Sequence, residues 1–378
     1  MKKILFISTR NPFSGRYSGD VIKSLEIIEL LRKKFHIEVI CLKEKRVKIR
    51  EKNIIYFNYP NLFVQFFYCL ISFFKFQPIQ FGLFFSKEMK NYIENYCDNY
   101  DYLFFYHIRS SQYLPKNYHG KTILEMGDLY SDNYYQTFKY LSFLNPLKYI
   151  YRLEGLLTKN IESKIFSNFD RIVLFSKSEV NRAKVKFEKK IFQINLSIKK
   201  LNKKYSFSKN NFRILFVGNL NYLPNFLACR DFIKNIAPQL NKKIPDVKFC
   251  LIGNINLLYK FFLPKKNNVE ILGPKKNLTP FIKSSLCGLA NLKVATGVQG
   301  KVLNYMSYGL PVICSNKVSH NFGKYVLSFK KNSELVDKII LLKKNRLKSN
   351  QFSKKSVQLA KKLNWSKVGQ DYFKLVDF

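Results

Sequence analysis

The sequence has 378 residues, more than one domain usually holds, and 47% of them are hydrophobic. The chain can bury two sizeable cores, and this composition excludes an intrinsically disordered protein. Lysine and arginine number 66 against 25 acidic residues, which gives a formal net charge of +41. Such a charge attracts anionic lipid, nucleic acid or phosphorylated substrates, although a codon bias towards lysine on solvated faces would produce it too.

The seven cysteines and four histidines do not form a pattern that binds metal. No two cysteines stand in a Cys-x-x-Cys, and most, such as Cys41 and Cys250, lie inside apolar runs. We therefore expect buried thiols in a reducing compartment, and no metal site. The apolar run Ile4–Ile7 is too short for a signal peptide. Leu62–Phe74, the longest apolar stretch, is too short to span a bilayer and is expected in a membrane interface or in the core.

In chain order, the first half opens with a predicted buried strand, Lys3–Ile7. A loop, Ser8–Gly19, and an amphipathic helix that begins near Asp20 follow, and then a strand at Ile37–Leu42. Further strands are expected at Tyr102–Tyr106, Lys121–Glu125 and Arg171–Phe175. Strand, loop, helix and strand in this order predict a βαβ unit and a parallel sheet.

The same pattern recurs after the midpoint, starting at the strand Arg213–Val217. A loop at Gly218–Pro224 leads to a helix near Asn225 and a strand at Val247–Gly253. Further strands are expected at Val269–Leu272, Cys287–Leu292 and Pro311–Ser315. The expected fold class is α/β, with two Rossmann-like doubly wound parallel-sheet domains, residues 1–200 and 201–355. Residues 356–378 are expected as a C-terminal helix that packs back towards the N-terminal domain.

Doubly wound sheets bind ligands at the carboxyl ends of their strands, which directs attention to three loops. They are Ser8–Gly19, Gly218–Pro224 and Lys293–Gly300. In the third loop, Gly297 and Gly300 precede a helix expected from about Val298 to Tyr308. Amides at that helix start can hold phosphate oxygens, and Lys301 adds a positive charge. An ordinary βαβ turn relieved by glycine explains the same residues equally well.

The segment Gly297–Val312, G-V-Q-G-K-V-L-N-Y-M-S-Y-G-L-P-V, resembles the donor-binding motif of family 4 glycosyltransferases, which have the GT-B fold. It is most similar to that of bacterial sugar transferases with the pattern G-I-Q-N-K-V-L-E-A-M-A-x-G-x-P-V-V. The resemblance covers nearly the whole chain. The other segments that match the family are Phe216–Asn225, Val269–Gly273 with Leu278, Gln77-Pro78, Arg109–Leu114, Leu124–Ser131, Tyr151–Glu154 and Phe169–Val173 with Ser176.

The resemblance implies transfer of a sugar from a nucleotide diphosphate sugar, commonly with retention of the anomeric configuration and without a divalent metal or other cofactor. The sequence has no Asp-x-Asp for such a metal, in agreement with this implication. In the family, the N-terminal domain binds the acceptor and the C-terminal domain binds the donor, in a cleft between them. Donor-binding residues are expected to be Gly15, Gly218, Asn219, Asn225, Gly273, Thr296, Gly297, Val298, Lys301 and Asn304.

The sequence departs from the family at two positions of the donor motif. The family often has two glutamates eight positions apart, the later of which touches the donor ribose, and here those positions hold Thr296 and Asn304. Asn304 still offers a donor and an acceptor to a sugar hydroxyl but not the stronger charge-assisted bond of a carboxylate. A catalytically degenerate GT-B scaffold is therefore an alternative.

The N-terminal half offers weaker candidates for the chemistry. Asp128 follows a strand and is expected to accept hydrogen bonds from a substrate hydroxyl, or else to cap the next helix. His107 is a candidate catalytic residue and Arg109 a candidate acceptor-binding residue, because both follow the strand Tyr102–Tyr106. In the first loop, Arg10 or Arg16 would add positive charge beside the donor phosphates.

We therefore expect a glycosyltransferase that uses a UDP- or GDP-sugar and a surface-polysaccharide or lipid-linked glycan acceptor. We expect it in the cytoplasm, where its positive charge would hold it peripherally on the anionic inner face of the membrane. A basic nucleic-acid-binding protein is the other reading of the charge. The sequence lacks the known nucleic-acid-binding motifs and has few arginines relative to lysines, so nucleic acid is not an expected partner.

Overall fold

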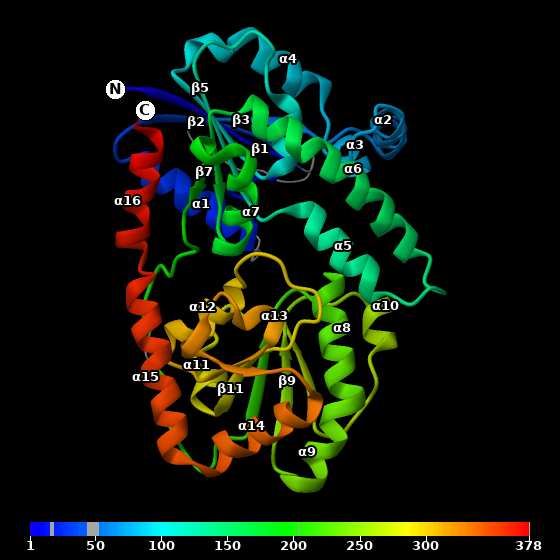
Figure 1. Cartoon of the computed structure of the whole chain (residues 1–378), viewed down its shortest axis with the longest axis vertical. Coiled ribbons are helices and arrows are strands. Elements are labelled where there is room, and N and C mark those ends of the chain that lie inside the picture. Colours follow the sequence, from blue (N-terminus) through cyan, green and yellow to red (C-terminus); the bar gives the residue numbers. More distant parts are fainter. Residues whose placement is uncertain (16–18, 44–52, 203, 378) are drawn as a thin grey trace. The chain divides into compact units, whose positions relative to one another are not determined.

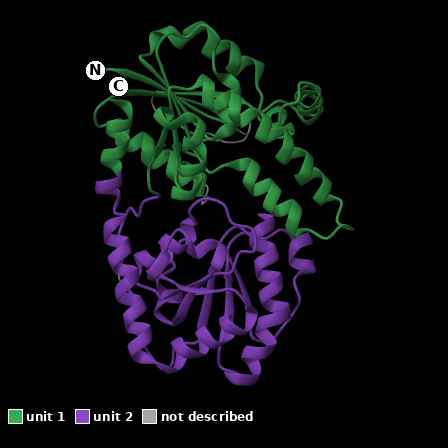
Figure 2. Cartoon of the chain, viewed as in Figure 1, with its two compact units in different colours: residues 1–195, 369–378 green, residues 196–368 purple. Residues whose placement is uncertain are grey.

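A computed structural model describes residues 1–15, 19–43, 53–202 and 204–377 of the chain (Figure 1). The expected role of Arg16 lies outside these residues. The chain forms two compact units (Figure 2). Residues 1–195 and 369–378 make the first, and residues 196–368 make the second.

The first unit is built on a seven-stranded parallel sheet with the strand order β3-β2-β1-β4-β5-β6-β7. Its strands are β1 (Lys3–Ser8), β2 (His36–Lys43), β3 (Ile54–Asn58), β4 (Tyr102–Tyr106), β5 (Lys121–Gly127), β6 (Arg171–Leu174) and β7 (Ile191–Gln193). Its helices include α1 (Gly19–Leu31), α2 (Leu62–Phe74), α3 (Ile79–Leu83), α4 (Lys87–Tyr96), α5 (Tyr130–Tyr140), α6 (Leu147–Asn168) and α7 (Lys177–Phe187). The central strands β1 and β4 are almost entirely buried, as the apolar runs predicted.

The second unit is built on a six-stranded parallel sheet with the order β10-β9-β8-β11-β12-β13. Its strands are β8 (Arg213–Val217), β9 (Lys248–Ile252), β10 (Val269–Gly273), β11 (Ser285–Ala290), β12 (Val312–Ser315) and β13 (Leu327–Phe329). Its helices are α8 (Leu223–Asp231), α9 (Ala237–Lys243), α10 (Leu257–Phe262), α11 (Thr279–Lys283), α12 (Gly300–Ser307), α13 (Asn316–Ser319), α14 (Asn332–Lys344) and α15 (Arg346–Lys362). A five-residue π-helical turn, Phe232–Ile236, joins α8 to α9.

The α/β fold of two doubly wound parallel sheets is confirmed. Each sheet reverses its strand order beside its first strand, β1 or β8, and this is where such sheets bind ligands. The sequence missed three strands, β3, β7 and β13. They lie at sheet edges, and β7 and β13 have only three residues each, so the hydrophobic pattern is too short to detect.

The C-terminal segment differs from the single helix expected for residues 356–378. Helix α15 begins at Arg346 and ends at Lys362, and α16 (Trp365–Val376) follows it. Asn364 causes the break, because its side chain accepts a hydrogen bond from the backbone N–H of Ser366 at 3.0 Å and so starts a new helix.

One arginine fastens the end of α16 to the sheet of the first unit. The Arg171 guanidinium, at the start of β6, donates to the carbonyls of Lys374, Leu375 and Asp377 at 3.0, 2.7 and 2.9 Å. These are carbonyls that a helix C-terminus leaves without an intrahelical partner. The cation therefore satisfies the helix end and fixes residues 369–377 to the first unit.

Replacing Arg171 with alanine should lower the free energy of unfolding by about 1–3 kcal/mol, because three charge-assisted hydrogen bonds are lost together. Urea unfolding measures the change. The matched control is Arg182→Ala, which removes an exposed ion pair with Asp132 and should cost less than about 1 kcal/mol. Equal effects of the two substitutions would contradict the role assigned to Arg171.

Candidate functional site

The first group of predicted residues surrounds the ammonium of Lys301, in the first turn of α12. Its Nζ donates to Oδ1 of Asn225 at 2.6 Å, and the Nδ2 of Asn225 donates to the carbonyl of Asn219 at 2.8 Å. The ammonium also lies 4.0 Å from the centre of the Phe216 ring. The structure thus brings the candidate residues of the β8 loop and of α12 together.

Gly218 is the position where this group comes closest to the backbone. A Cβ there would lie 3.0 Å from Asn225 Nδ2 and 3.3 Å from Lys301 Nζ. Any side chain at residue 218 would therefore push against the lysine. Burial lowers the pKa of Lys301 to about 8, and the described surroundings contain no carboxylate that pairs with it. A buried cation without a carboxylate partner gains from an anionic ligand.

The loop before α12 contains a left-handed residue, which is a glycine. Gly297 has φ of 60°, in the left-handed region, and its carbonyl accepts a hydrogen bond from the Asn321 amide at 2.6 Å. Thr296 is buried, and its carbonyl accepts from the side-chain amide of Gln299. Val298 is half-buried.

Helix α12 begins at Gly300, two residues later than expected, with Gln299 as its N-cap and no side chain on the first amides. Such an N-terminus provides backbone donors and the positive end of the helix dipole to an anion. Asn304 follows Lys301 by three residues, so both lie on one face of α12, and it is half-buried. Gly273 ends β10 with φ of 65°, where the pairing with β9 shifts register.

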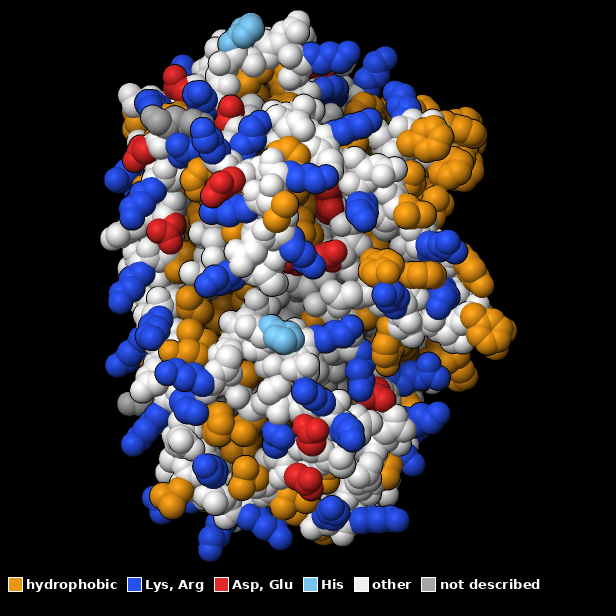
Figure 3. All heavy atoms as spheres, in the orientation of Figure 1, with side chains coloured by type: hydrophobic (Ala, Val, Ile, Leu, Met, Phe, Trp, Pro, Cys, Tyr) orange, Lys and Arg blue, Asp and Glu red, His pale blue; other side chains and the backbone are white. Residues whose placement is uncertain are grey.

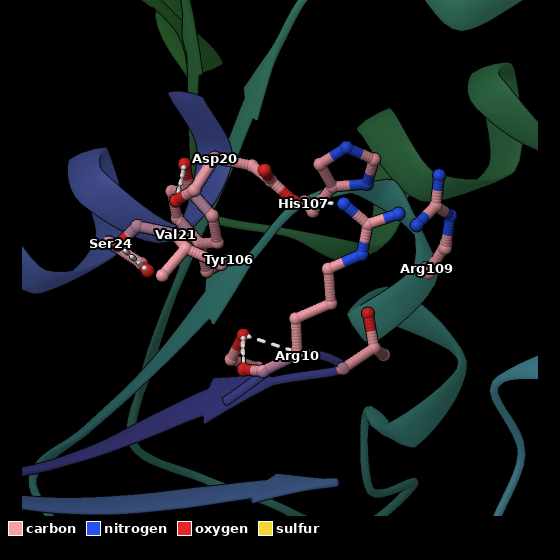
Figure 4. A pocket seen from close by; sticks show the side chains of 9 residues that line it. Arg10, Asp20, Val21, Ser24, Tyr106, His107 and Arg109 are labelled. Atoms are coloured by element: carbon pink, nitrogen blue, oxygen red, sulfur yellow. Dashed lines mark hydrogen bonds and ion pairs between the residues drawn. The ribbon is translucent and has the colours of Figure 1, made fainter. Parts of the chain in front are cut away.

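A second group of candidates lines a small pocket of the first unit (Figure 4). The guanidinium of Arg10, which follows β1, extends towards His107 and Arg109, which follow β4, and it forms an ion pair with Asp20 of α1. The lining residues are Ser8, Thr9, Arg10, Asp20, Val21, Ser24, Tyr106, His107 and Arg109. Two guanidinium groups beside one carboxylate leave this pocket with an excess of positive charge.

His107 is held in an unusual conformation at the pocket wall. Its φ is 75°, in a region that non-glycine residues rarely adopt. Its backbone N–H donates to the Glu125 carbonyl at 2.7 Å. The ring pairs through Nε2 with the hydroxyl of Tyr130, whereas the buried Nδ1 has no partner among the described residues. Burial, then Arg109 and Arg10, lower the pKa of His107 well below its ordinary value. The imidazole is therefore neutral at neutral pH.

Arg109 is oriented directly by Gln80, which Glu154 in turn holds in place. Its Nε donates to Oε1 of Gln80 at 2.9 Å, and its guanidinium lies 4.4 Å from the centre of the Phe84 ring. Gln80 is in the first turn of α3, where the Glu154 carboxylate accepts from the N–H groups of Ile79 and Gln80 at 2.8 and 3.0 Å. Two separate segments of the resemblance, Gln77-Pro78 and Tyr151–Glu154, thus meet at the start of α3.

Asp128 does not cap the next helix, since Leu129 occupies the N-cap of α5. The alternative role considered for Asp128 is therefore wrong. The carboxyl follows the end of β5 at Gly127, whose φ is 77°, and burial raises its pKa to about 7. Asp128 is not among the residues that line the pocket. Gly15 has φ of 68° and an open position, so it serves as a turn residue just before the undescribed residues 16–18.

Three residues of this region were missed as functional candidates: Asp20, Gln80 and Tyr130. Asp20 was interpreted only as the start of a helix, and its pairing with Arg10 depends on how the β1–α1 loop folds. Gln80 is near Gln77-Pro78, so the resemblance indicated the right segment. Tyr130 lies within Leu124–Ser131, which the resemblance also indicated, but its contact with His107 joins residues that follow different strands and leaves no local signal in the sequence.

The fold of the chain is similar to that of solved GT-B glycosyltransferases. TarM of S. aureus aligns over 99% of this chain and 98% of its own, with a TM-score of 0.70 and 11% identity. HepE of Anabaena, in complex with UDP, aligns over all of both chains with a TM-score of 0.68 and 12% identity. A trehalose-6-phosphate protein of E. coli, bound with UDP-2-fluoro glucose, aligns over 99% and 98% with a TM-score of 0.66 and 10% identity.

Residues 211–345, most of the second unit, match the family model Glycosyl transferases group 1. The chain thus contains a Glycosyl transferases group 1 domain in a GT-B fold, and it is a glycosyltransferase. The sequence has no significant match among curated proteins. The expected fold and enzyme class are confirmed, whereas the roles of individual site residues remain predictions.

The raised pKa of Asp128 predicts how stability depends on pH. The folded protein keeps the proton up to a pH of about 7, whereas an unfolded aspartate loses it at roughly pH 4. Stability should therefore fall as the pH rises through this window, by up to about 4 kcal/mol. Asp128→Asn should abolish that part of the fall in urea unfolding across the pH range, and Asp98→Asn, at an exposed position, should retain it. A wild-type curve that matches Asp128→Asn would contradict the burial of this carboxyl.

Proposed function

We propose that this enzyme transfers a sugar from a UDP- or GDP-sugar to a surface-polysaccharide or lipid-linked glycan acceptor, with retention of the anomeric configuration. The reaction takes place at the cytoplasmic, anionic face of a membrane. The observation that carries the proposal is the buried Lys301 ammonium beside the uncapped N-terminus of α12. UDP-glucose is bound in HepE, and UDP together with fondaparinux and alpha-GlcNAc-glycerol in TarM. These ligands support a nucleotide sugar as donor and a glycan as acceptor.

The donor diphosphate is the group that this part of the second unit suits. Transfer breaks the bond between the sugar and the diphosphate, so negative charge grows on the leaving phosphate oxygen. Lys301 and the first amides of α12 supply positive charge to that oxygen, which is the kind of stabilisation that lowers such a barrier. Gly218 lets the nucleotide approach the lysine, and Asn304 offers its amide to a ribose hydroxyl.

The pocket of the first unit supplies groups that bind an acceptor. The unpartnered Nδ1 of His107 can exchange a hydrogen bond with a sugar hydroxyl, and the neutral imidazole can accept its proton. Arg109 and Arg10 bind oxygen-rich or anionic parts of a glycan. Asp128 is a second candidate acceptor of a hydroxyl hydrogen. Turnover of UDP- and GDP-sugars, measured with glycan and lipid-linked acceptors, tests the proposal directly.

Lys301→Ala should weaken UDP or GDP binding by about 1–3 kcal/mol, because a charge-assisted hydrogen bond to the diphosphate is lost. Nucleotide affinity of the wild type should also fall as the pH rises through about 8, where the ammonium loses its proton, and Lys301→Ala should lack that fall. Calorimetry measures both. Lys338→Ala, which removes a half-buried lysine of α14 that pairs with Glu334, is the control. Unchanged affinity in folded Lys301→Ala would remove this lysine from the donor site.

Turnover should not require a divalent metal, because the sequence lacks an Asp-x-Asp and Lys301 with α12 provides the positive charge that a metal would otherwise supply. We expect the same rate in excess chelator as in its absence, measured as release of nucleotide from the sugar donor. A loss of activity that added Mg²⁺ or Mn²⁺ restores would count against the metal-free mechanism.

A further inference from the structure

Helix α2 exposes an entirely apolar half of its surface. Eight of its residues are exposed, and at 100° per residue they occupy an arc of about 180°. They are Leu62, Phe63, Phe66, Phe67, Leu70, Ile71, Phe73 and Phe74. Leu62 and Phe74 are 84% and 75% exposed. The expectation that this stretch forms part of the core is therefore wrong for its outer half, which on a soluble surface would face water.

The inner half of α2 carries the polar side chains, the reverse of a helix on a water-facing surface. Ser72 is buried and Gln65 half-buried on that side. The helix packs closely on α3, since a Cβ on Gly82 would lie 2.3 Å from the backbone nitrogen of Cys69. The helix is thus held firmly against the first unit with its apolar half directed outward.

The charged residues that neighbour α2 in the sequence are lysines, Lys75 and Lys87. Residues 53–87 include no Asp or Glu. A surface hollow lies beside the C-terminal end of α2, and its lining includes Lys75, Lys159 and Lys164, all exposed. None of the three pairs with a carboxylate in the described residues. The other polar groups of the hollow, Gln77, Asn160 and Ser163, are uncharged.

A second apolar patch of the first unit surrounds the turn between α5 and α6. Figure 3 shows hydrophobic side chains gathered over α2 and, below them, over this turn on the same side of the unit. The exposed members are Tyr135, Tyr140, Phe143, Leu144, Leu147, Tyr149 and Ile150. Residues 133–153 include no Asp or Glu and carry Lys139, Lys148 and Arg152. Aromatic and basic side chains mixed in this way are typical of surfaces that meet a bilayer.

We propose that α2 lies in the interface of an anionic bilayer, with its apolar half at the acyl boundary and the lysines of the hollow against lipid phosphates. The turn between α5 and α6 makes the second contact. Among the described residues no helix is long and apolar enough to cross a membrane. This inference identifies the surface that the proposed function requires, and its test does not depend on turnover.

A second copy of the chain fits this surface less well than a bilayer does. Two copies would bring together faces that both carry uncompensated lysines, on chains of net charge +41. An anionic leaflet supplies the opposite charge along the whole surface, and its headgroups match the lysines while its acyl chains match the phenylalanines. Charge complementarity therefore selects lipid as the occupant.

The test is sedimentation of the full chain with phosphatidylcholine vesicles that either contain phosphatidylglycerol or lack it. The wild type should bind the anionic vesicles and keep part of that binding in high salt. Phe66→Ser with Leu70→Ser leaves the charge unchanged and should lower the partition coefficient by about tenfold or more, because two large apolar side chains are lost. Phe66→Leu is the matched control and should bind as the wild type does.

The lysines of the hollow are tested by Lys75→Gln, Lys159→Gln and Lys164→Gln together. This variant should lose affinity for anionic vesicles by about a factor of five for each lysine near the surface. Lys184→Gln, Lys186→Gln and Lys189→Gln make the same change in charge at exposed positions on and just after α7, and should have a smaller effect. Equal losses in both triple variants would overturn the assignment of the hollow to headgroups.

Insertion of α2 into the bilayer is measured separately, through the fluorescence of a tryptophan placed on this helix. Phe66→Trp adds a second indole to Trp365, and its fluorescence should shift to the blue and be quenched by brominated lipid, whereas the wild type should change little. An unquenched indole, or wild-type binding by the serine variant, would overturn the proposal. So would a concentration-dependent dimer that the serine substitutions dissociate. Vesicle binding without sugar transfer would leave this inference intact and count against the proposed function.

Discussion

The carboxylate of Glu154 holds together the parts of the first unit on which its proposed chemistry depends. It accepts hydrogen bonds from the first two amides of α3, and burial raises its pKa while these bonds oppose the rise. Helix α3 has only five residues, too few to be stable alone. A negative charge at its N-terminus stabilises the short helix, because it satisfies amides that have no intrahelical partner.

Helix α3 connects two surfaces of different chemistry. Through Gly82 it touches the backbone of α2, and through Gln80 it orients Arg109 at the pocket. A lipid surface that binds α2 and a glycan that binds Arg109 would therefore both be in contact with residues that pack on the same short helix, α3. This arrangement would suit an enzyme whose acceptor is anchored in the bilayer, because the arginine is held at a fixed offset from the helix that we propose meets the lipid.

The fold was largely predictable from the sequence, because buried parallel strands are written as short apolar runs such as Tyr102–Tyr106 and Arg213–Val217. The edge strands β7 and β13 and the break at Asn364 were not, since they depend on three residues each or on one cap. In the candidate donor site the sequence indicated Lys301 and Gly218 through loop position and resemblance. It could not show that Asn225 would hold the ammonium, because that contact joins residues 76 positions apart.

The apolar stretch Leu62–Phe74 shows where sequence reasoning stops. Its residues are as hydrophobic as those of a core helix, so composition alone leaves the core and the membrane interface open. The direction of its faces excludes a core position for the outer half, and that direction is set by Gly82 and by the polar Gln65 and Ser72 turned towards the unit. Phe76, just beyond α2, has φ of 53° and is 75% exposed, so the chain bears a backbone strain there while keeping an aromatic ring outside. Transfer of such a ring from water to contact with an acyl chain would be favourable.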